Sequence, residues 1–247
     1  HEHTHHHIIV NNSLMPGCAM QPGFFAFFSK VFFKNWFVEF GPFGGVQPED
    51  WKKELLNFLH NDVVKTQRLM LKAEVLRNKK TVYSSFGLNE IVICATRAAS
   101  AISLDVEYNS VPLCKLISDG VIVSTPTGST GYNLSAGGPL VSPKTSLMII
   151  TPISPHSLTS KSIVLSSEDE IVIEVLKMRK AQKEEAIVNF DGQPGIQLSA
   201  GDRIVIKKAV SFTKMVKLLD VSFYEVLREK NGKKLFCGTD RRCIGRK

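Results

Sequence analysis

The sequence predicts an α+β protein in which a helical segment precedes a large domain built from β-strands. Two observations support this class. Apolar residues recur at helical spacing within residues 48–60, and they alternate with polar residues in many short segments within residues 67–210. Short strands separated by turn residues are typical of a β-sandwich rather than of alternating βαβ units. We therefore expect a β-sandwich domain over residues 67–210.

The helix is predicted over residues 48–60. Its apolar positions have the spacing of a single helix face: Trp51, Leu55, Phe58 and Leu59. Glu49 and Asp50 fall in its first turn, where the helix dipole favours acidic side chains. We therefore expect an amphipathic helix whose apolar face is buried.

The strand predictions come from alternation with a period of two. Leu69, Leu71, Ala73 and Val75 share one face of a segment, and Ile102, Leu104, Val106 and Tyr108 share one face of another. Further strands are predicted at residues 91–95, 121–124, 147–151, 171–176, 187–190, 204–207 and 215–226. Most of their connections carry Gly, Pro, Asn, Asp or Ser, which favour turns.

The position of the basic residues and the spacing of the cysteines exclude some classes of function. Eight of the basic residues and only two acids lie in residues 228–247, so this tail carries +6 of the net charge of +8. We interpret the tail as solvated and expect neither a nucleic-acid nor a membrane partner. The five cysteines are scattered and form no CxxC pair, which favours a reducing, cytoplasmic location without a zinc site.

The start of the chain differs in amino-acid composition from the rest. Residues 1–5, HEHTH, match the HExxH pattern of zinc metalloproteases, but a chain terminus supplies no stable helix to place both imidazoles on one face. Nine of the fifteen phenylalanines lie in residues 24–43, and charged residues interrupt this run, so it is no spanning segment. We expect no metal site, no signal peptide and no membrane span.

The densest group of chemically useful residues lies in residues 119–143. Ser124-Thr125-Pro126-Thr127-Gly128-Ser129-Thr130-Gly131-Tyr132 combines hydroxyl side chains with glycines, so backbone amides and hydroxyls can approach a ligand closely. A short helix is predicted from Ser129 to the stop signal Gly137-Gly138-Pro139. This composition suits ribose hydroxyls or phosphates, although it also occurs in ordinary loops. The segment is not a P-loop, because no Gly-Lys-Ser/Thr follows.

The run S-T-P-T-G-S-T-x-Y-x-x-S-A-G-G-P resembles the signature of the NAD kinase family almost position for position. Further segments resemble the family in the same order: Leu88-Asn89-Glu90, Thr151 to Ser157, Phe190-Asp191-Gly192-Gln193, Gly201-Asp202 and Phe223 to Leu227. Together they cover residues 46–230. The resemblance implies transfer of a phosphoryl group from ATP or polyphosphate, with Mg, to the 2′-hydroxyl of the adenosine ribose of NAD, giving NADP.

The resemblance also implies which residues contact the nucleotide. Asn89 and Glu90 match a pair that binds the dinucleotide, and an amide beside a carboxylate suits vicinal ribose hydroxyls. The other implied contacts are Asp119, Ser129, Thr130, Gly131, Tyr132, Ser135, His156, Asp191 and Gln193. Two of them have an alternative interpretation: Asp191 as a turn residue before Gly192, and His156 as a structural residue.

The resemblance further implies an architecture and an assembly. It predicts a Rossmann-like α/β domain, here incomplete and with an aberrant start, over residues 1–66, and a nucleotide-binding β-sandwich over residues 67–210. Residues 211–230 would return to the first domain, and residues 231–247 would form the basic tail. The expected assembly is a homodimer or homotetramer, with sites at or near the subunit contacts.

One family motif is absent. The sequence has no Gly-Gly-Asp-Gly, whose aspartate is the expected general base; Gly44-Gly45 is followed by Val46 and Gln47. We therefore assign no catalytic residue and predict little or no kinase activity for this polypeptide alone. A non-catalytic NAD- or NADP-binding protein is the alternative. A third hypothesis is a lipid kinase of the related superfamily, but the TPTGST-x-Y signature argues against it.

Overall fold

The computed structural model of the chain describes residues 64–97, 100–157, 159–177, 186–217 and 223, and the backbone of three short strands before residue 40. The chain divides into two compact units, one of residues 1–67 and 214–247 and one of residues 68–213. The predicted helix over residues 48–60 and the basic tail lie outside the described residues. Among those described, no helix has the length and hydropathy that spanning a bilayer requires.

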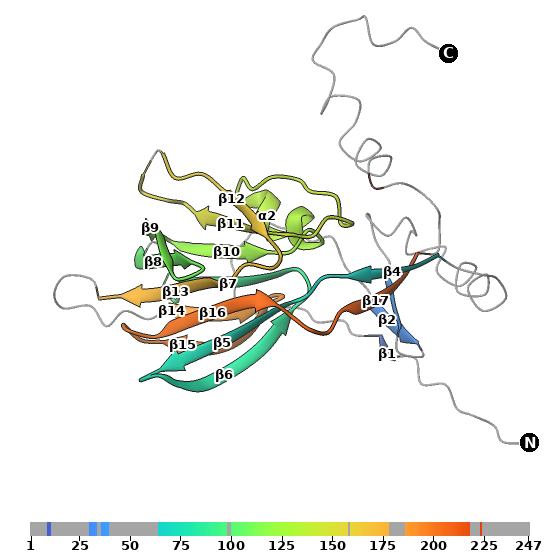
Figure 1. Ribbon diagram of the computed structural model, residues 1–247, viewed down its shortest axis with the longest axis horizontal. Coiled ribbons are helices and arrows are strands. Elements are labelled where there is room, and N and C mark those ends of the chain that lie inside the picture. Colours follow the sequence, from blue (N-terminus) through green and yellow to red (C-terminus); the bar gives the residue numbers. More distant parts are fainter. Residues whose placement is uncertain are drawn as a thin grey trace, which may run out of the picture. The chain divides into compact units, whose positions relative to one another are not determined.

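The unit of residues 68–213 is a sandwich of two six-stranded antiparallel sheets (Figure 1). Sheet I has the order β12 (Ile163–Ser166), β11 (Leu147–Ile153), β10 (Gly120–Ser124), β7 (Glu90–Ala95), β14 (Ala186–Phe190) and β15 (Gln193–Leu198). Sheet II has the order β6 (Lys80–Gly87), β5 (Leu71–Arg77), β16 (Arg203–Lys208), β13 (Ile171–Leu176), β8 (Ile102–Tyr108) and β9 (Val111–Ser118). The predicted β-sandwich is confirmed.

The core lies between the two sheets and consists of the alternating apolar positions of both. Sheet II contributes residues such as Leu71, Leu104 and Ile173, each fully buried. Sheet I contributes Ile91, Val121, Met148 and others from its inner face. Because successive side chains of a strand point to opposite faces, this alternation places one face of each sheet in the core.

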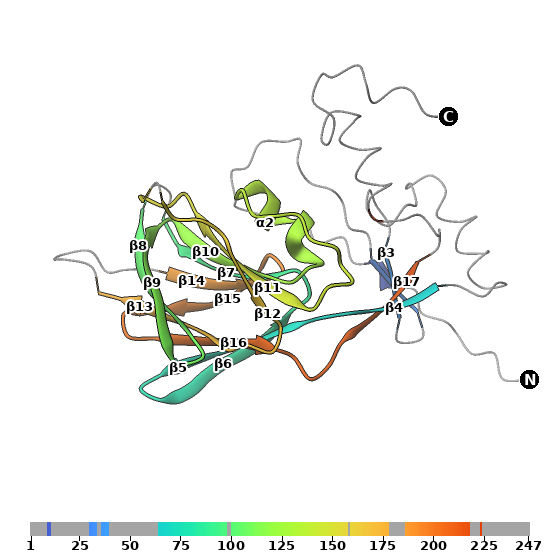
Figure 2. The ribbon, with the colours of Figure 1, turned by 45° about the horizontal axis from the view of Figure 1, so that its top comes forward.

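The central strands of sheet I are buried on their outer face as well. Val92, Ile122 and Ile149 alternate with the core residues, yet each is at most 6% exposed. The segment of the short elements η1 (Gly128–Thr130) and α2 (Tyr132–Ser135) lies beside β10 and β11 in both views (Figures 1 and 2). This cover explains why residues 121–123 form an uninterrupted apolar run.

Three tight hairpins connect strands of the sandwich through two residues with positive φ. They are Asn78-Lys79 between β5 and β6, Asn109-Ser110 between β8 and β9, and Asp191-Gly192 between β14 and β15. Two-residue loops with positive φ at both positions match the right-handed twist of the flanking strands, and Asn, Asp and Gly tolerate that conformation best. The fold therefore places Asp191 at a hairpin tip.

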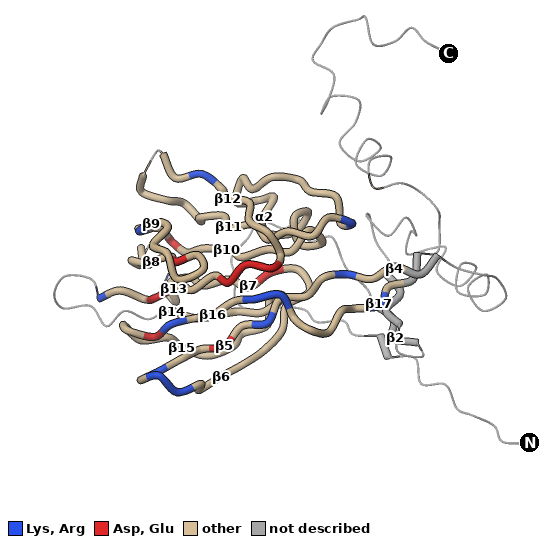
Figure 3. Tube along the Cα trace, in the orientation of Figure 1, with Lys and Arg blue, Asp and Glu red and all other residues tan. Residues whose placement is uncertain are grey.

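Ion pairs connect different segments of sheet II, and both signs of charge occur over its strands (Figure 3). The Arg77 guanidinium lies 2.7 Å from the buried carboxylate of Asp202, whose hydrogen bond and negative charge raise the pKa of Arg77. Arg203 and Glu107 form a second pair at 2.6 Å. The basic residues of this sheet are thus interspersed with acids.

The other unit contains a five-stranded sheet of order β1 (Ile9–Val10), β2 (Lys30–Phe33), β3 (Trp36–Glu39), β17 (Thr213–Lys217) and β4 (Val64–Arg68). Strand β17 pairs with β3 in parallel. The prediction of one strand over residues 215–226 is wrong at its far end, because Phe223 is helical.

Candidate functional site

Three loops meet at one end of sheet I. The turn of residues 88–90 leads into β7, the loop of residues 125–131 follows β10, and the hairpin tip at Asp191 follows β14. Because β7 runs antiparallel to both neighbours, its start lies beside their ends: Glu90 pairs with Ser124, and Ile91 pairs with Phe190. The sheet topology thus brings together segments that are far apart in the sequence.

The Asn89–Glu90 turn is bound on one side by Asp191. The carboxylate accepts hydrogen bonds from the backbone N–H groups of Leu88 at 2.7 Å, Asn89 at 2.7 Å and Glu90 at 3.1 Å. Asp191 has a φ of 47°, as its predicted alternative role of turn residue requires. The residue therefore serves the hairpin and the neighbouring turn together.

The same turn is bound on its other side by Thr125, which the sequence did not single out. The Thr125 hydroxyl donates to the Leu88 carbonyl at 2.6 Å, and its backbone N–H donates to the Asn89 carbonyl at 2.8 Å. The hydroxyl also accepts from the Gly128 N–H at 3.1 Å. Thr125 is fully buried, so its role is to join two loops rather than to contact a ligand.

Two glycines allow the loop of residues 125–131 to lie against the turn. A Cβ on Gly128 would lie 2.0 Å from the Asn89 carbonyl oxygen, so no other residue fits there without a shift of the turn. A Cβ on Gly131 would lie 3.2 Å from the Glu90 carboxylate oxygen Oε2. The Glu90 carboxylate and Gly131 are therefore immediate neighbours, as the prediction of a shared site requires.

The predicted helix from Ser129 to Gly137 is not continuous. It consists of the turn η1 and the four-residue helix α2, separated at Gly131 with φ −92° and ψ −134°. The prediction of a single helix over this segment is therefore wrong. Gly137, with φ 84°, still lies directly beyond the helical segment, as the stop signal predicted.

Two buried polar residues fix this segment on sheet I. The Ser129 hydroxyl donates to the Pro126 carbonyl at 2.8 Å and accepts from the Val141 N–H at 3.2 Å. The Asn133 amide donates to the carbonyls of Ser129 at 3.2 Å and Pro139 at 3.1 Å, and it accepts from the Thr151 hydroxyl at 2.7 Å. Ser129 was predicted to contact the ligand, but it is fully buried. Its hydroxyl instead holds the loop in place through these hydrogen bonds.

The remaining predicted residues at this end are accessible. Asn89, Thr130, Gly131 and Tyr132 are half-buried, while Ser135 and Gln193 are exposed. Among the described residues, none hydrogen-bonds the side-chain amide of Asn89. The amide and the hydroxyls are thus placed where polar groups of a ligand could reach them.

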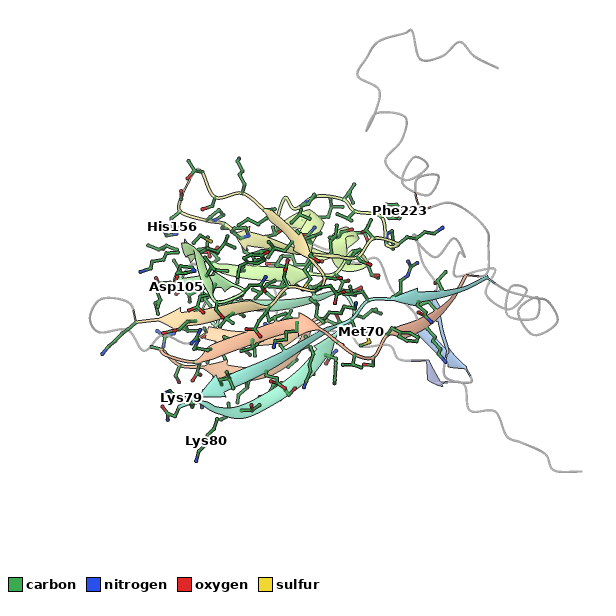
Figure 4. The ribbon with its side chains drawn as sticks, viewed as in Figure 1. Met70, Lys79, Lys80, Asp105, His156 and Phe223 are labelled. Carbon is green, nitrogen blue, oxygen red and sulfur yellow. The ribbon has the colours of Figure 1, made fainter. Side chains whose placement is uncertain are left out.

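Asp119 and His156 do not belong to this group. Asp119 precedes β10 while Thr125 follows it, and five residues of strand separate the two by about 17 Å or more. The His156 N–H donates to the Ile117 carbonyl at 2.9 Å, which places it by β9 (Figure 4). Asp119 thus lies at the opposite end of β10 from the loop cluster of its own chain, and its contact with a nucleotide stays a prediction.

The fold and the loop cluster define a β-sandwich domain with a polar site at one end of sheet I. The family model described as the ATP-NAD kinase C-terminal domain matches residues 88–218. The chain belongs to the NAD kinase family.

Curated relatives agree with this assignment. The chain is 44% identical to a NAD kinase of Lachnoclostridium phytofermentans over 169 residues, which cover 68% of this chain and 59% of that protein. It is 49% identical to the NAD kinase of Agathobacter rectalis over 60% of this chain and 53% of that protein. It is 36% identical to a NAD kinase of Treponema denticola over 78% and 67%, respectively. The matches thus span between about half and two thirds of these relatives.

Solved structures show the same fold. The crystal structure of yeast NADH kinase complexed with NADH superimposes with a TM-score of 0.72 at 23% identity, covering 79% of this chain and 58% of that chain. The structure of an NAD kinase from Archaeoglobus fulgidus in complex with ATP superimposes with a TM-score of 0.61 at 27% identity, covering 76% and 70%. The likeness to the yeast enzyme is one of fold.

Proposed function

We propose that this protein is a NAD kinase whose β-sandwich binds the adenosine ribose of NAD at the Asn89–Glu90 turn. The activity would be ATP-dependent phosphorylation of the ribose 2′-hydroxyl to give NADP. The observation that carries the proposal is the packing of Gly128 and Gly131 against this turn, which places an amide, a carboxylate and the Thr130 and Tyr132 hydroxyls at one end of sheet I.

The chemistry of these groups supports a ribose as ligand. A side-chain amide both donates and accepts, and a carboxylate accepts strongly, so the pair at Asn89 and Glu90 complements two neighbouring hydroxyls. Tyr132 adds an aromatic face suited to a base or a nicotinamide ring. The relative of known structure named as binding NADH has the same fold, which is consistent with this proposal.

The phosphoryl donor is proposed to be ATP or polyphosphate. Mg would enter with the phosphates, since this cation is usually held by substrate phosphates and few carboxylates. An archaeal family member holds ATP in its crystal structure. We place the protein in the cytoplasm, where a thiol such as Cys114 remains reduced.

The assembly is proposed to be a homodimer or homotetramer. Asp119 and His156 lie away from the loop cluster of their own chain, so a nucleotide there contacts them only from a second subunit. The family resemblance, which implies sites at or near subunit contacts, supports this arrangement. We expect neither nucleic acid nor a membrane as a partner.

Calorimetric titration of the 247-residue chain with NAD and with NADP tests the proposed binding. We expect saturable binding of both in the micromolar range, and Asn89→Ala should weaken it by about tenfold, the cost of leaving ribose hydroxyls unpaired. Asn109→Ala, at the β8–β9 hairpin, is the matched control and should leave the affinity unchanged. The proposal fails if neither nucleotide binds, or if the two variants weaken binding equally.

A non-catalytic dinucleotide-binding protein is the second candidate, favoured by the absence of Gly-Gly-Asp-Gly from the sequence. It shares the proposed site and differs only in turnover. Binding of NAD at micromolar concentration with no formation of NADP from ATP and Mg²⁺ is its signature.

A further inference from the structure

Each backbone N–H and carbonyl of the Asn89–Glu90 turn has a hydrogen-bond partner within the protein. All three N–H groups of residues 88–90 donate to the Asp191 carboxylate. The carbonyls of Leu88 and Asn89 accept from Thr125, and the carbonyl of Glu90 accepts from the Asp191 N–H at 3.1 Å. Two residues from two other loops, Asp191 and Thr125, therefore bond to every main-chain polar group of the turn.

This arrangement is unusual for a turn at the end of a strand, where backbone groups normally bond to water. It leaves recognition at this position to the side chains of Asn89 and Glu90. It also restricts their directions, because rotation of the turn would break several hydrogen bonds together.

We propose that Asp191 is a positioning residue of the nucleotide site, which acts through the Asn89–Glu90 turn and does not itself bind the nucleotide. This inference rests on the function proposed above for the same site. It replaces the expectation, drawn from the family resemblance, that the Asp191 carboxylate contacts the ligand.

The hydrogen bonds of the carboxylate carry this inference. Oδ1 accepts from the N–H groups of Asn89 and Glu90, and Oδ2 accepts from that of Leu88, so both oxygens already accept charge-assisted hydrogen bonds from the turn. Three of the roughly four acceptor sites of the carboxylate are therefore used by the turn. The hairpin tip supplies the rigidity, because Asp191 and Gly192 both have positive φ and their strands pair on either side.

Asp191→Asn is the most selective change. Asparagine adopts positive φ at least as readily as aspartate, so the hairpin should be retained. The new amide has the size of the carboxylate, but its NH₂ group donates and cannot accept from a backbone N–H. The change therefore removes acceptors from the turn and leaves the hairpin conformation in place.

Amide hydrogen exchange in the absence of nucleotide measures the first consequence. We expect exchange at residues 88–90 to accelerate by about tenfold or more in Asp191→Asn, since hydrogen bonds to a charged group are lost. Asp169→Asn is the matched control, because Asp169 also accepts a backbone N–H, from Ser166 at 2.9 Å, at a distant turn. Unchanged exchange at residues 88–90 would overturn the proposal, even if the chain bound no NAD.

A double-mutant cycle on NAD affinity measures the second consequence. If Asp191 acts through Asn89, then Asp191→Asn weakens NAD binding by about tenfold in the parent chain but by less than about twofold when Asn89 is already alanine. Equal fold-losses in both backgrounds would show an independent contact of Asp191 with the nucleotide and overturn the proposal. Failure of the parent chain to bind NAD would instead refute the proposed function, while the exchange result still decides the role of Asp191.

Discussion

Replacement of Gly128 by alanine is expected to weaken NAD binding by about a hundredfold. The added Cβ would lie 2.0 Å from the Asn89 carbonyl oxygen and 2.5 Å from its carbon, both parts of the backbone. Relief of this clash requires the Asn89 turn to move, although Asp191 and Thr125 hold it from either side. The strain should cost about 3 kcal/mol, equivalent to about a hundredfold in affinity.

Calorimetry and urea unfolding of the Gly128→Ala chain measure the two parts of this effect. Gly201→Ala is the control: Gly201 has φ 88° but nothing within 4 Å of an added Cβ. It should therefore lose only about 1 kcal/mol of stability through backbone strain and keep its affinity for NAD. Normal NAD binding by Gly128→Ala would show that this packing does not shape the site.

The second large expected effect is a low rate of NADP formation. The 247-residue polypeptide, given NAD and ATP with Mg²⁺, should form NADP at a rate about 10³-fold or more below that of a relative that carries Gly-Gly-Asp-Gly, since a general base and phosphate-binding amides each contribute powers of ten. A coupled assay with an NADP-dependent dehydrogenase measures this rate. The NAD kinase of Lachnoclostridium phytofermentans, assayed beside it, is a suitable reference.

A rate similar to that of the reference would show that another group accepts the proton of the ribose hydroxyl. Low turnover together with normal affinity for NAD would separate the binding role of the β-sandwich from catalysis. The two measurements belong together, because weak binding alone would also lower the rate.

The interior strands of the sandwich were predictable and its edges were not. Strands such as β8 and β13 alternate apolar residues toward the core, which produces a clear period of two. The edge strands of both sheets were not predicted: β6, β9, β12 and β15. Edge strands carry many exposed residues and so lack the apolar pattern by which strands are found.

Local chemistry identified the loop of residues 125–131, but not which of its residues face a ligand. Ser129 and Thr125 are buried and hydrogen-bond residues that are near in space but distant along the chain, such as Leu88 for Thr125. Composition carries no information on such partners. The separation of Asp119 from Thr125, in contrast, follows from the five-residue strand between them and was readable from the sequence.

A crystal structure of the chain with NAD tests the central claim most directly. We predict that the adenosine ribose lies within hydrogen-bond distance of the Asn89 and Glu90 side chains, with Asp191 still bound to the turn behind them. An NAD molecule seated elsewhere, with its ribose hydroxyls out of reach of both side chains, would contradict this account.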